Sequence, residues 1–322
     1  MNIRAMALGV LATLMATGAA WAWEPSEPIE VVVHNAPGGG NDILARALLS
    51  IIEREKMVPV RMQVANRSGG GSTTAAAYMK EKAGNPHVIA VFSNLWTSST
   101  LLQAEATVAP ADLTPIATLL FDPAVVVVAK DSPYQSLTEL LDKGKAEPGK
   151  IKMGGGSVSG REYIMLQQLK SAAGIDWKYI SFPSGGERVA ALLGGHVDVM
   201  IMEPAEAAEL VRGGQIRVLA KAGKEEIAEF PEAKPLSDFG IAIELVSAAR
   251  GVAGTPDIPA EAVDYYADLF KRVLETQEWK DYAVKSMVTT NFMGPADSKA
   301  FLATLTDEMR QALKSSGIEV VR

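Results

Sequence analysis

The chain has 322 residues, with 31 Lys and Arg, 38 Asp and Glu and no Cys, which gives a formal net charge of −7. This acidic balance argues against nucleic-acid binding, and a hydrophobic share of 48% excludes intrinsic disorder. Without cysteine there are no disulfides, thiolate metal sites or cysteine nucleophiles, and three histidines leave little material for imidazole chemistry. We therefore expect a globular protein of about two domains, with no metal and no cofactor.

The first 22 residues have the pattern of a secretory signal peptide. Arg4 precedes an apolar run over residues 5–20, and Ala20-Trp21-Ala22 is a small-x-small cleavage signal. The run is too short to span a bilayer, which takes about 20 apolar residues. We expect cleavage near Ala22 and an exported, soluble mature protein.

Strands and helices alternate along most of the chain. The apolar spacing predicts a first unit with strands at 29–33, 60–65 and 88–92 and helices at 43–56 and 73–83. A second unit has predicted strands at 124–129, 151–153, 178–182, 197–202 and 216–220 and helices at 137–145, 161–173 and 187–193. After a strand at 247–252 the end is helical, with helices at 260–275, 278–286 and 298–315. The alternation predicts parallel strand pairing and an α/β fold.

The helical end suggests that the chain returns to cover the first unit. We expect a discontinuous first domain of residues 23–123 and 223–322, and a second domain of residues 124–222. Two crossings between such domains make a hinge that can close around a ligand.

Four predicted strands are followed by a glycine-rich turn and a helix, which is the construction of an anion receptor. The first turn of a helix leaves N–H groups unpaired, and the helix dipole adds positive charge there. Glycine lets an oxygen ligand approach the backbone closely. Hydroxyl groups from Ser68, Ser72, Thr73, Ser157, Ser159 and Ser184 add further donors. An acidic protein can bind an anion in this way without a basic patch.

Enzymes that bind phosphate use the same physics, but their motifs are missing. The sequence has no G-x-x-x-x-G-K-[ST], and neither of the first two glycine turns matches G-x-G-x-x-G. His34, His87 and His196 are isolated, so we assign no catalytic residue. Asp42 most simply caps the helix that follows it, although direct or water-mediated ligand contact is compatible with its position.

Arginine and aromatic side chains near the turns are further candidates. Arg161, Arg67 and Arg188 lie in or just after the turns, where a bidentate guanidinium would suit a carboxylate. A structural salt bridge or a solvated helix face explains each of them equally simply. Trp96 and Phe182 could form apolar walls of a site, but core packing accounts for both as well.

The turns and several later segments resemble one family, the extracytoplasmic solute receptors of tripartite tricarboxylate transporters, also called Bug proteins. Asn35-Ala36-Pro37-Gly38-Gly39-Gly40-Asn41-Asp42 with Arg46 is similar to the family's PGG-x-x-D-x-x-x-R motif. Asn66-Arg67-Ser68-Gly69-Gly70-Gly71 resembles its NRPGAGG loop. Matches continue through Leu192-Leu193-Gly194-Gly195-His196-Val197-Asp198 to Arg250-Gly251-Val252-Ala253-Gly254-Thr255-Pro256. Six such motifs occur in the family's order over nearly the whole mature chain.

The resemblance implies a type II periplasmic-binding fold, with two α/β domains, a hinge and a cleft that closes on an organic acid. It implies that the first domain holds one carboxylate through Ala36, Gly38, Gly39, Asp42, Ser68 and Gly69. Ser93 at a strand end, and Gly155, Ser157, Ser159, Ser184 and Gly185 of the second domain, would read the rest of the ligand. Arg161 has no counterpart in the family motif and suggests a second carboxylate on the ligand.

The leading interpretation is therefore a monomeric periplasmic receptor for a di- or tricarboxylate or an aromatic acid, without enzymatic activity. It would deliver this cargo to the large and small membrane subunits of a transporter. One alternative is an exported hydrolase or transferase that uses the glycine turns for a phosphate. Another is a sensor partner that presents bound ligand to a membrane kinase, which shares the same binding chemistry.

Overall fold

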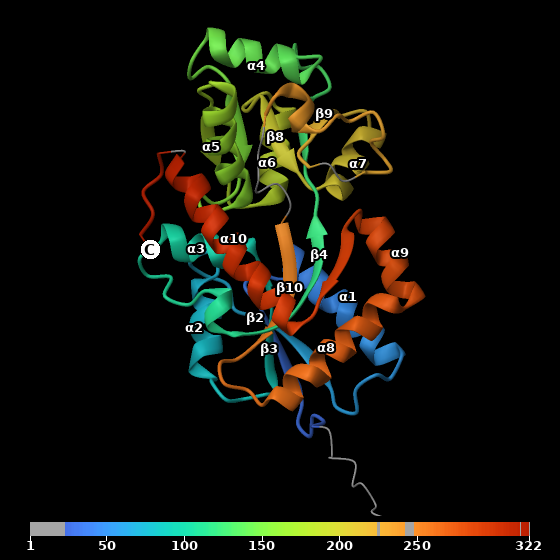
Figure 1. The fold of residues 1–322 in the computed structure, drawn as a ribbon. Coiled ribbons are helices and arrows are strands. Elements are labelled where there is room, and N and C mark those ends of the chain that lie inside the picture. The colour runs from blue at the N-terminus through green and yellow to red at the C-terminus, as the bar shows by residue number, and fades with distance from the viewer. Residues whose placement is uncertain (1–22, 224–225, 242–247, 316, 322) are drawn as a thin grey trace, which may run out of the picture.

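The computed structural model describes residues 23–223, 226–241, 248–315 and 317–321, and these form two lobes (Figure 1). The expected signal peptide, residues 1–22, lies outside the described residues. None of the helices in the described part is long and apolar enough to cross a membrane.

The first lobe is built around a mixed sheet. Its strands lie in the spatial order β11 (Thr289–Met293), β4 (Thr114–Asp122), β10 (Ala248–Gly254), β3 (Val88–Ser93), β1 (Ile29–Val33) and β2 (Met62–Asn66). Its helices are α1 (Gly40–Arg54), α2 (Thr73–Glu81), α3 (Asn94–Leu102), α8 (Ala260–Glu275), α9 (Gln277–Ser286) and α10 (Pro295–Ser315), with a short helix η1 (Pro110–Asp112). The helical end of the chain therefore does return to the first unit.

The second lobe has its own sheet. The strand order is β7 (Lys178–Ser181), β6 (Lys152–Gly155), β8 (Val199–Met202), β5 (Val125–Ala129) and β9 (Ile216–Lys221). Its helices are α4 (Leu137–Ala146), α5 (Arg161–Ala173), α6 (Gly185–Leu193) and α7 (Pro204–Arg212). The short helix η2 (Leu236–Phe239) follows β9 along the chain. All five residues of β5 are buried, as in a strand that is covered on both faces.

The expectation of parallel pairing holds for only part of each sheet. β1 pairs in parallel with β2 and β3, and β6 with β7 and β8. β10 is antiparallel to β3 and β4, and β5 is antiparallel to β8 and β9. The first strand after each crossing, β5 in the second lobe and β10 in the first, therefore runs against both of its neighbours. β11 at the sheet edge also runs against β4, which itself has the direction of β1–β3.

Two strands of the first lobe lead to and from the second lobe. β4 ends at Asp122 and β5 of the second lobe begins at Val125. On the return, Leu236 and Ile241 pack in the core of the second lobe, and β10, which pairs with β4, begins at Ala248. The expected division of the chain at residues 123 and 222 stays a prediction.

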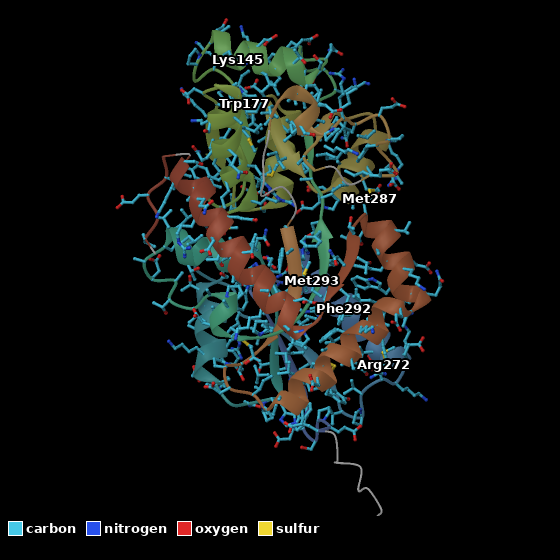
Figure 2. All side chains as sticks on the ribbon, viewed as in Figure 1. Lys145, Trp177, Arg272, Met287, Phe292 and Met293 are labelled. Carbon is cyan, nitrogen blue, oxygen red and sulfur yellow. The ribbon has the colours of Figure 1, made fainter. Side chains whose placement is uncertain are left out.

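The lobes also touch away from the crossings. Ile164 of α5 is buried in the same apolar cluster as Met309 of α10, which runs from the first lobe toward α5 in Figure 1. Met287, labelled at the end of α9 in Figure 2, packs against the core of the second lobe. A hydrogen bond of 2.7 Å from Ser98 Oγ to the Ser159 carbonyl joins α3 to the turn before α5. These contacts enclose the space between the sheets from several sides.

Helix α4 rests on the buried indole of Trp177 and supplies a test of how tightly the second lobe is packed (Figure 2). A Cβ placed on Gly144 would lie 2.2 Å from Trp177 Nε1. Alanine normally favours a helix over glycine by about 1 kcal/mol. We expect Gly144→Ala to lower the free energy of unfolding by about 1–3 kcal/mol instead, because overpacking outweighs that preference.

Urea unfolding measures this difference, with Lys145→Ala as the control at the exposed next position of α4, labelled in Figure 2. The control should change the free energy of unfolding by less than about 0.5 kcal/mol. A stabilised Gly144→Ala variant would contradict the close packing of α4 on Trp177.

Candidate functional site

A cavity of about 340 Å³ lies between the two sheets. It is lined by turns that follow β1, β3, β6, β7 and β8 and by the start of β10, so both lobes contribute. Ligand sites of open α/β sheets form at the carboxyl ends of such strands. The residues that line the cavity include His34, Asn35, Gly40, Asn41, Ser93, Gly156, Ser157, Arg161, Glu162, Phe182, Ser184, Gly185, Arg188, Glu203 and Arg250.

The turn between β1 and α1 is held by the carboxylate of Asp42. This group accepts hydrogen bonds from Gly38 N at 2.8 Å, Arg46 Nε at 3.0 Å and Asn66 Nδ2 at 2.9 Å. The hydrogen bond from Arg46, helped by those from Gly38 and Asn66, lowers the pKa of Asp42 to about 2. The Gly38 amide, expected to face the ligand, is thus already bonded inside the protein.

The expectation that Asp42 is the helix N-cap is wrong. Gly39 occupies that position, and Asp42 is the third residue of α1. Its side chain reaches back to the turn, as an acidic residue at the third helical position does in a capping box. Asp42 therefore stabilises the helix start from inside the helix, and the carboxylate does accept a backbone N–H as expected.

His34 has no other candidate catalytic residue near it in the sequence. In the structure it is buried in the cavity lining, with 6% of its surface exposed. Its Nδ1 accepts a hydrogen bond of 2.8 Å from the indole N–H of Trp96. An indole N–H can only donate, so the neutral ring carries its proton on Nε2. Burial, together with the nearby charge of Arg250, lowers the pKa of His34 to about 4. Nε2–H has no hydrogen-bond partner among the described residues and is a neutral donor in the cavity lining.

Three arginines line the cavity, and each is paired with a carboxylate of the protein. Arg161 Nη2 lies 3.1 Å from Glu203 Oε1 and Arg188 Nη1 lies 3.0 Å from Glu162 Oε1. Arg250 of β10 forms an ion pair with Asp122 at the end of β4.

Arg161 spans the junction of the lobes as well. Its Nη1 donates to the carbonyl of Asp122 at 3.0 Å, at the first crossing. Arg67, by contrast, pairs with Glu30 at 3.0 Å and stacks on Tyr78, and it is not among the cavity-lining residues.

The carboxylates of this region differ in their surroundings. Burial raises the pKa of Asp122, although Arg250 opposes the shift. Burial also acts to raise the pKa of Glu203, but Arg161 and Arg250 outweigh it and hold that pKa below its usual value. Burial and the neighbouring Glu203 raise the pKa of Glu206. Glu206 forms no ion pair within the described residues. The cavity is thus a site of mixed and nearly balanced charge.

The structure brings together some of the residues expected to bind ligand and not others. Ser93, Ser157, Arg161, Ser184 and Gly185 line the cavity. The remaining candidates lie outside its lining, namely Ala36, Gly38, Gly39, Asp42, Ser68, Gly69, Gly155 and Ser159. Two of these have other surroundings that explain their position. Ser159 is 1% exposed and packs against α3, and a Cβ on Gly155 would strike the Tyr179 hydroxyl.

The turn 68–72 lies toward the contact between the lobes rather than toward the cavity. A Cβ on Gly71 would approach Ser99 Oγ to 2.9 Å and Ser159 Oγ to 3.7 Å. Gly71 has a φ of +72°, which also favours glycine. This close approach of three backbone segments accounts for the glycine there without a ligand.

The sequence analysis gave no ligand-binding role to four residues of the cavity lining with ionisable side chains: His34, Glu162, Glu203 and Arg250. Two of them carried a usable signal. Glu203 directly follows the fully buried strand β8, where a strand end meets a ligand crevice. Arg250 is a charged residue within a predicted buried strand, a position that demands a partner.

Two lobes that enclose a polar cavity at their strand ends define a two-domain binding protein. The chain belongs to the family described as tripartite tricarboxylate transporter family receptor, whose pattern it matches over residues 31–316. It is 25% identical over 299 residues to the UPF0065 protein in gbd 5'region of Cupriavidus necator, a match that covers 91% of this chain and 89% of the relative.

Solved structures share the fold. The R. palustris protein Rpa4515 with adipate has a TM-score of 0.83 at 17% identity, covering 92% of this chain and 99% of its own. The periplasmic binding protein BugD has a TM-score of 0.80 at 18% identity, with the same coverage. The fold is thus the periplasmic-binding fold that the sequence motifs implied, and members of the family are periplasmic binding proteins.

The depressed pKa of Asp42 makes a prediction about stability. Its ionised form is favoured in the folded protein, so its stabilisation is present above about pH 4 and is lost as the pH falls toward about 2. We expect Asp42→Asn to cost about 1–2 kcal/mol of unfolding free energy at pH 7. Urea unfolding of the variant and the parent should begin to converge below about pH 4 and should coincide only as the pH approaches about 2. Asp142→Asn, at an exposed position of α4, is the control and should show no such convergence.

The tautomer of His34 is testable by NMR. We expect ring ¹⁵N shifts of a neutral Nε2–H form that do not titrate between about pH 5.5 and 8, because its pKa is about 4. Trp96→Phe removes the indole donor and should allow the other tautomer to appear. A ring that titrates near the ordinary pKa of about 6.5 would contradict the buried, neutral donor.

Proposed function

We propose that the protein is a receptor that captures a small organic carboxylate in the cavity between its lobes. The observation that carries this proposal is the meeting of two donors at the N-terminus of α1. A Cβ on Gly40 would lie 2.9 Å from Arg250 Nη1, so the guanidinium lies directly against the start of this helix. The same charge acts on His34, which contributes its Nε2–H to the same cavity. A guanidinium, a neutral N–H and a helix N-terminus together favour a carboxylate.

The second lobe would complete the enclosure of the ligand. Ser157, Ser184 and Gly185 stand at the starts of α5 and α6 and offer hydroxyl and amide groups. Phe182 supplies an apolar surface beside them. A volume of about 340 Å³ lies in the range of small-molecule sites and suits an acid of about four to six carbons.

We infer further that the receptor acts after export and passes its cargo to a membrane transporter with large and small subunits. Support comes from the family to which the chain belongs and from the signal-peptide pattern of residues 1–22. The adipate named with the similar R. palustris protein is a small dicarboxylate, which fits the same general class of ligand. Presentation of the ligand to a sensor would use the same cavity, and the family description favours transport.

A cavity-filling substitution tests the location of the ligand. Gly156 lines the cavity, and a Cβ there meets no atom within 4 Å, so a larger side chain fits the fold but fills the site. We expect Gly156→Leu to weaken binding of a carboxylate, found by a thermal-shift panel, by at least about 10-fold without lowering the melting temperature of the free protein.

Gly186→Leu is the matched control, because Gly186 has equally open space but lies outside the cavity lining. Calorimetric titration of both variants separates the cases. Equal affinity in Gly156→Leu and the parent would contradict binding in this cavity.

A further inference from the structure

The carboxylates around the cavity outnumber the arginines by one. Arg161, Arg188 and Arg250 are matched by Glu203, Glu162 and Asp122. Glu206, the third residue of α7, has no ion-pair partner among the described residues. Its Oε1 would lie 3.9 Å from a Cβ on Gly185, and Arg188 Nη2 would lie 3.6 Å from the same point, so both groups stand beside the cavity lining. Arg188 is already paired with Glu162, and four carboxylates thus face three guanidinium groups, which leaves the site with a formal charge of −1.

Carboxylates of the protein also occupy the helix starts of the second lobe. Glu203 is the N-cap residue of α7, and its carboxylate is part of the cavity lining and 37% exposed although it pairs with Arg161. Glu162 Oε2 lies against Gly160, the N-cap of α5, at 3.0 Å from the position of a Cβ there. These carboxylates therefore already reduce the positive potential that the helix starts of the second lobe would offer to a ligand anion.

This arrangement disfavours a second carboxylate on the ligand. Arg161 was the residue expected to bind such a group, but it is paired with Glu203 and bonded to the Asp122 carbonyl. A dianion in a cleft with little water would leave at least one negative charge next to Glu206 and Glu203 without compensation. A cationic group in the same place would instead meet two carboxylates.

We propose that the ligand is a zwitterion, whose carboxylate binds His34 and Arg250 and whose ammonium group faces Glu203 and Glu206. The proposal rests on the proposed function, since it takes one carboxylate as given and specifies what lies at the other end. Glu206 provides a carboxylate without an ion pair in the described structure, and Glu203 provides a partly exposed carboxylate in the cavity lining. The two ends of the site therefore select opposite charges.

The test compares acids with and without an amino group in the parent and in Glu206→Gln. The probes are three pairs: butyrate and 4-aminobutyrate, hexanoate and 6-aminohexanoate, glutarate and glutamate. Calorimetry should show the amino acid of at least one pair binding about 10-fold or more tightly than its partner. Glu206→Gln should remove most of this preference by weakening the binding of the amino acids, and it should strengthen the binding of glutarate, whose second carboxylate no longer faces a charged Glu206.

Two features keep the test interpretable. Glu206→Gln breaks no ion pair of the described structure. Glu209→Gln is the control on the same helix: it also removes one carboxylate, at an exposed position where its ion pair with Arg212 is solvated. Glu203→Gln frees Arg161 and should shift the preference from glutamate toward glutarate.

The outcomes separate the two claims. Tighter binding of the amino-free acids, with no effect of Glu206→Gln on the preference, would overturn the zwitterion but leave the carboxylate receptor intact. Failure of every acid in the three pairs to bind the parent would overturn both.

Discussion

Pairing of buried charge governs the space between the two lobes. Arg161, Arg188 and Arg250 each meet a carboxylate there, and unpaired charge in such a place would be costly. Two of these pairs also act on the junction. Arg250 follows the return of the chain and pairs with Asp122 at the first crossing, and Arg161 reaches the same crossing from the second lobe. Under the proposed function, Arg250 both contacts the ligand and joins the return strand to the first crossing, so ligand binding would act on the relation between the lobes.

Helix starts have a different role from the one that their glycines suggest. At the first turn, Asp42 takes the Gly38 amide, and at the turn 68–72 the glycines serve close contact between the lobes. We propose that His34 and Arg250 bind the ligand anion on the first lobe. Trp96 fixes the tautomer of His34, and the low pKa of His34 keeps its ring neutral. The proposed anion site is thus made mainly by side chains at a helix start.

Local patterns predicted most of the fold. Strand β1 and helix α8 occur over the expected residues because each has an unbroken apolar period and a clear stop. Strand β4 was overlooked because Pro115 interrupts its start, and α7 because its first helical residue is Pro204. The site was less predictable. The pairing of Arg161 with Glu203 joins residues 42 positions apart, and only tertiary structure reveals that the arginine is already occupied. Strand ends predicted where the cavity lies, but not which donors remain free in it.

A crystal structure of the exported protein with its best-binding carboxylate tests the account most directly. The predicted result is a ligand between the lobes, with carboxylate oxygens about 2.7–3.2 Å from His34 Nε2 and from the guanidinium of Arg250. A ligand held at the turn 68–72 or on an outer face, with His34 and Arg250 making no contact to it, would contradict it.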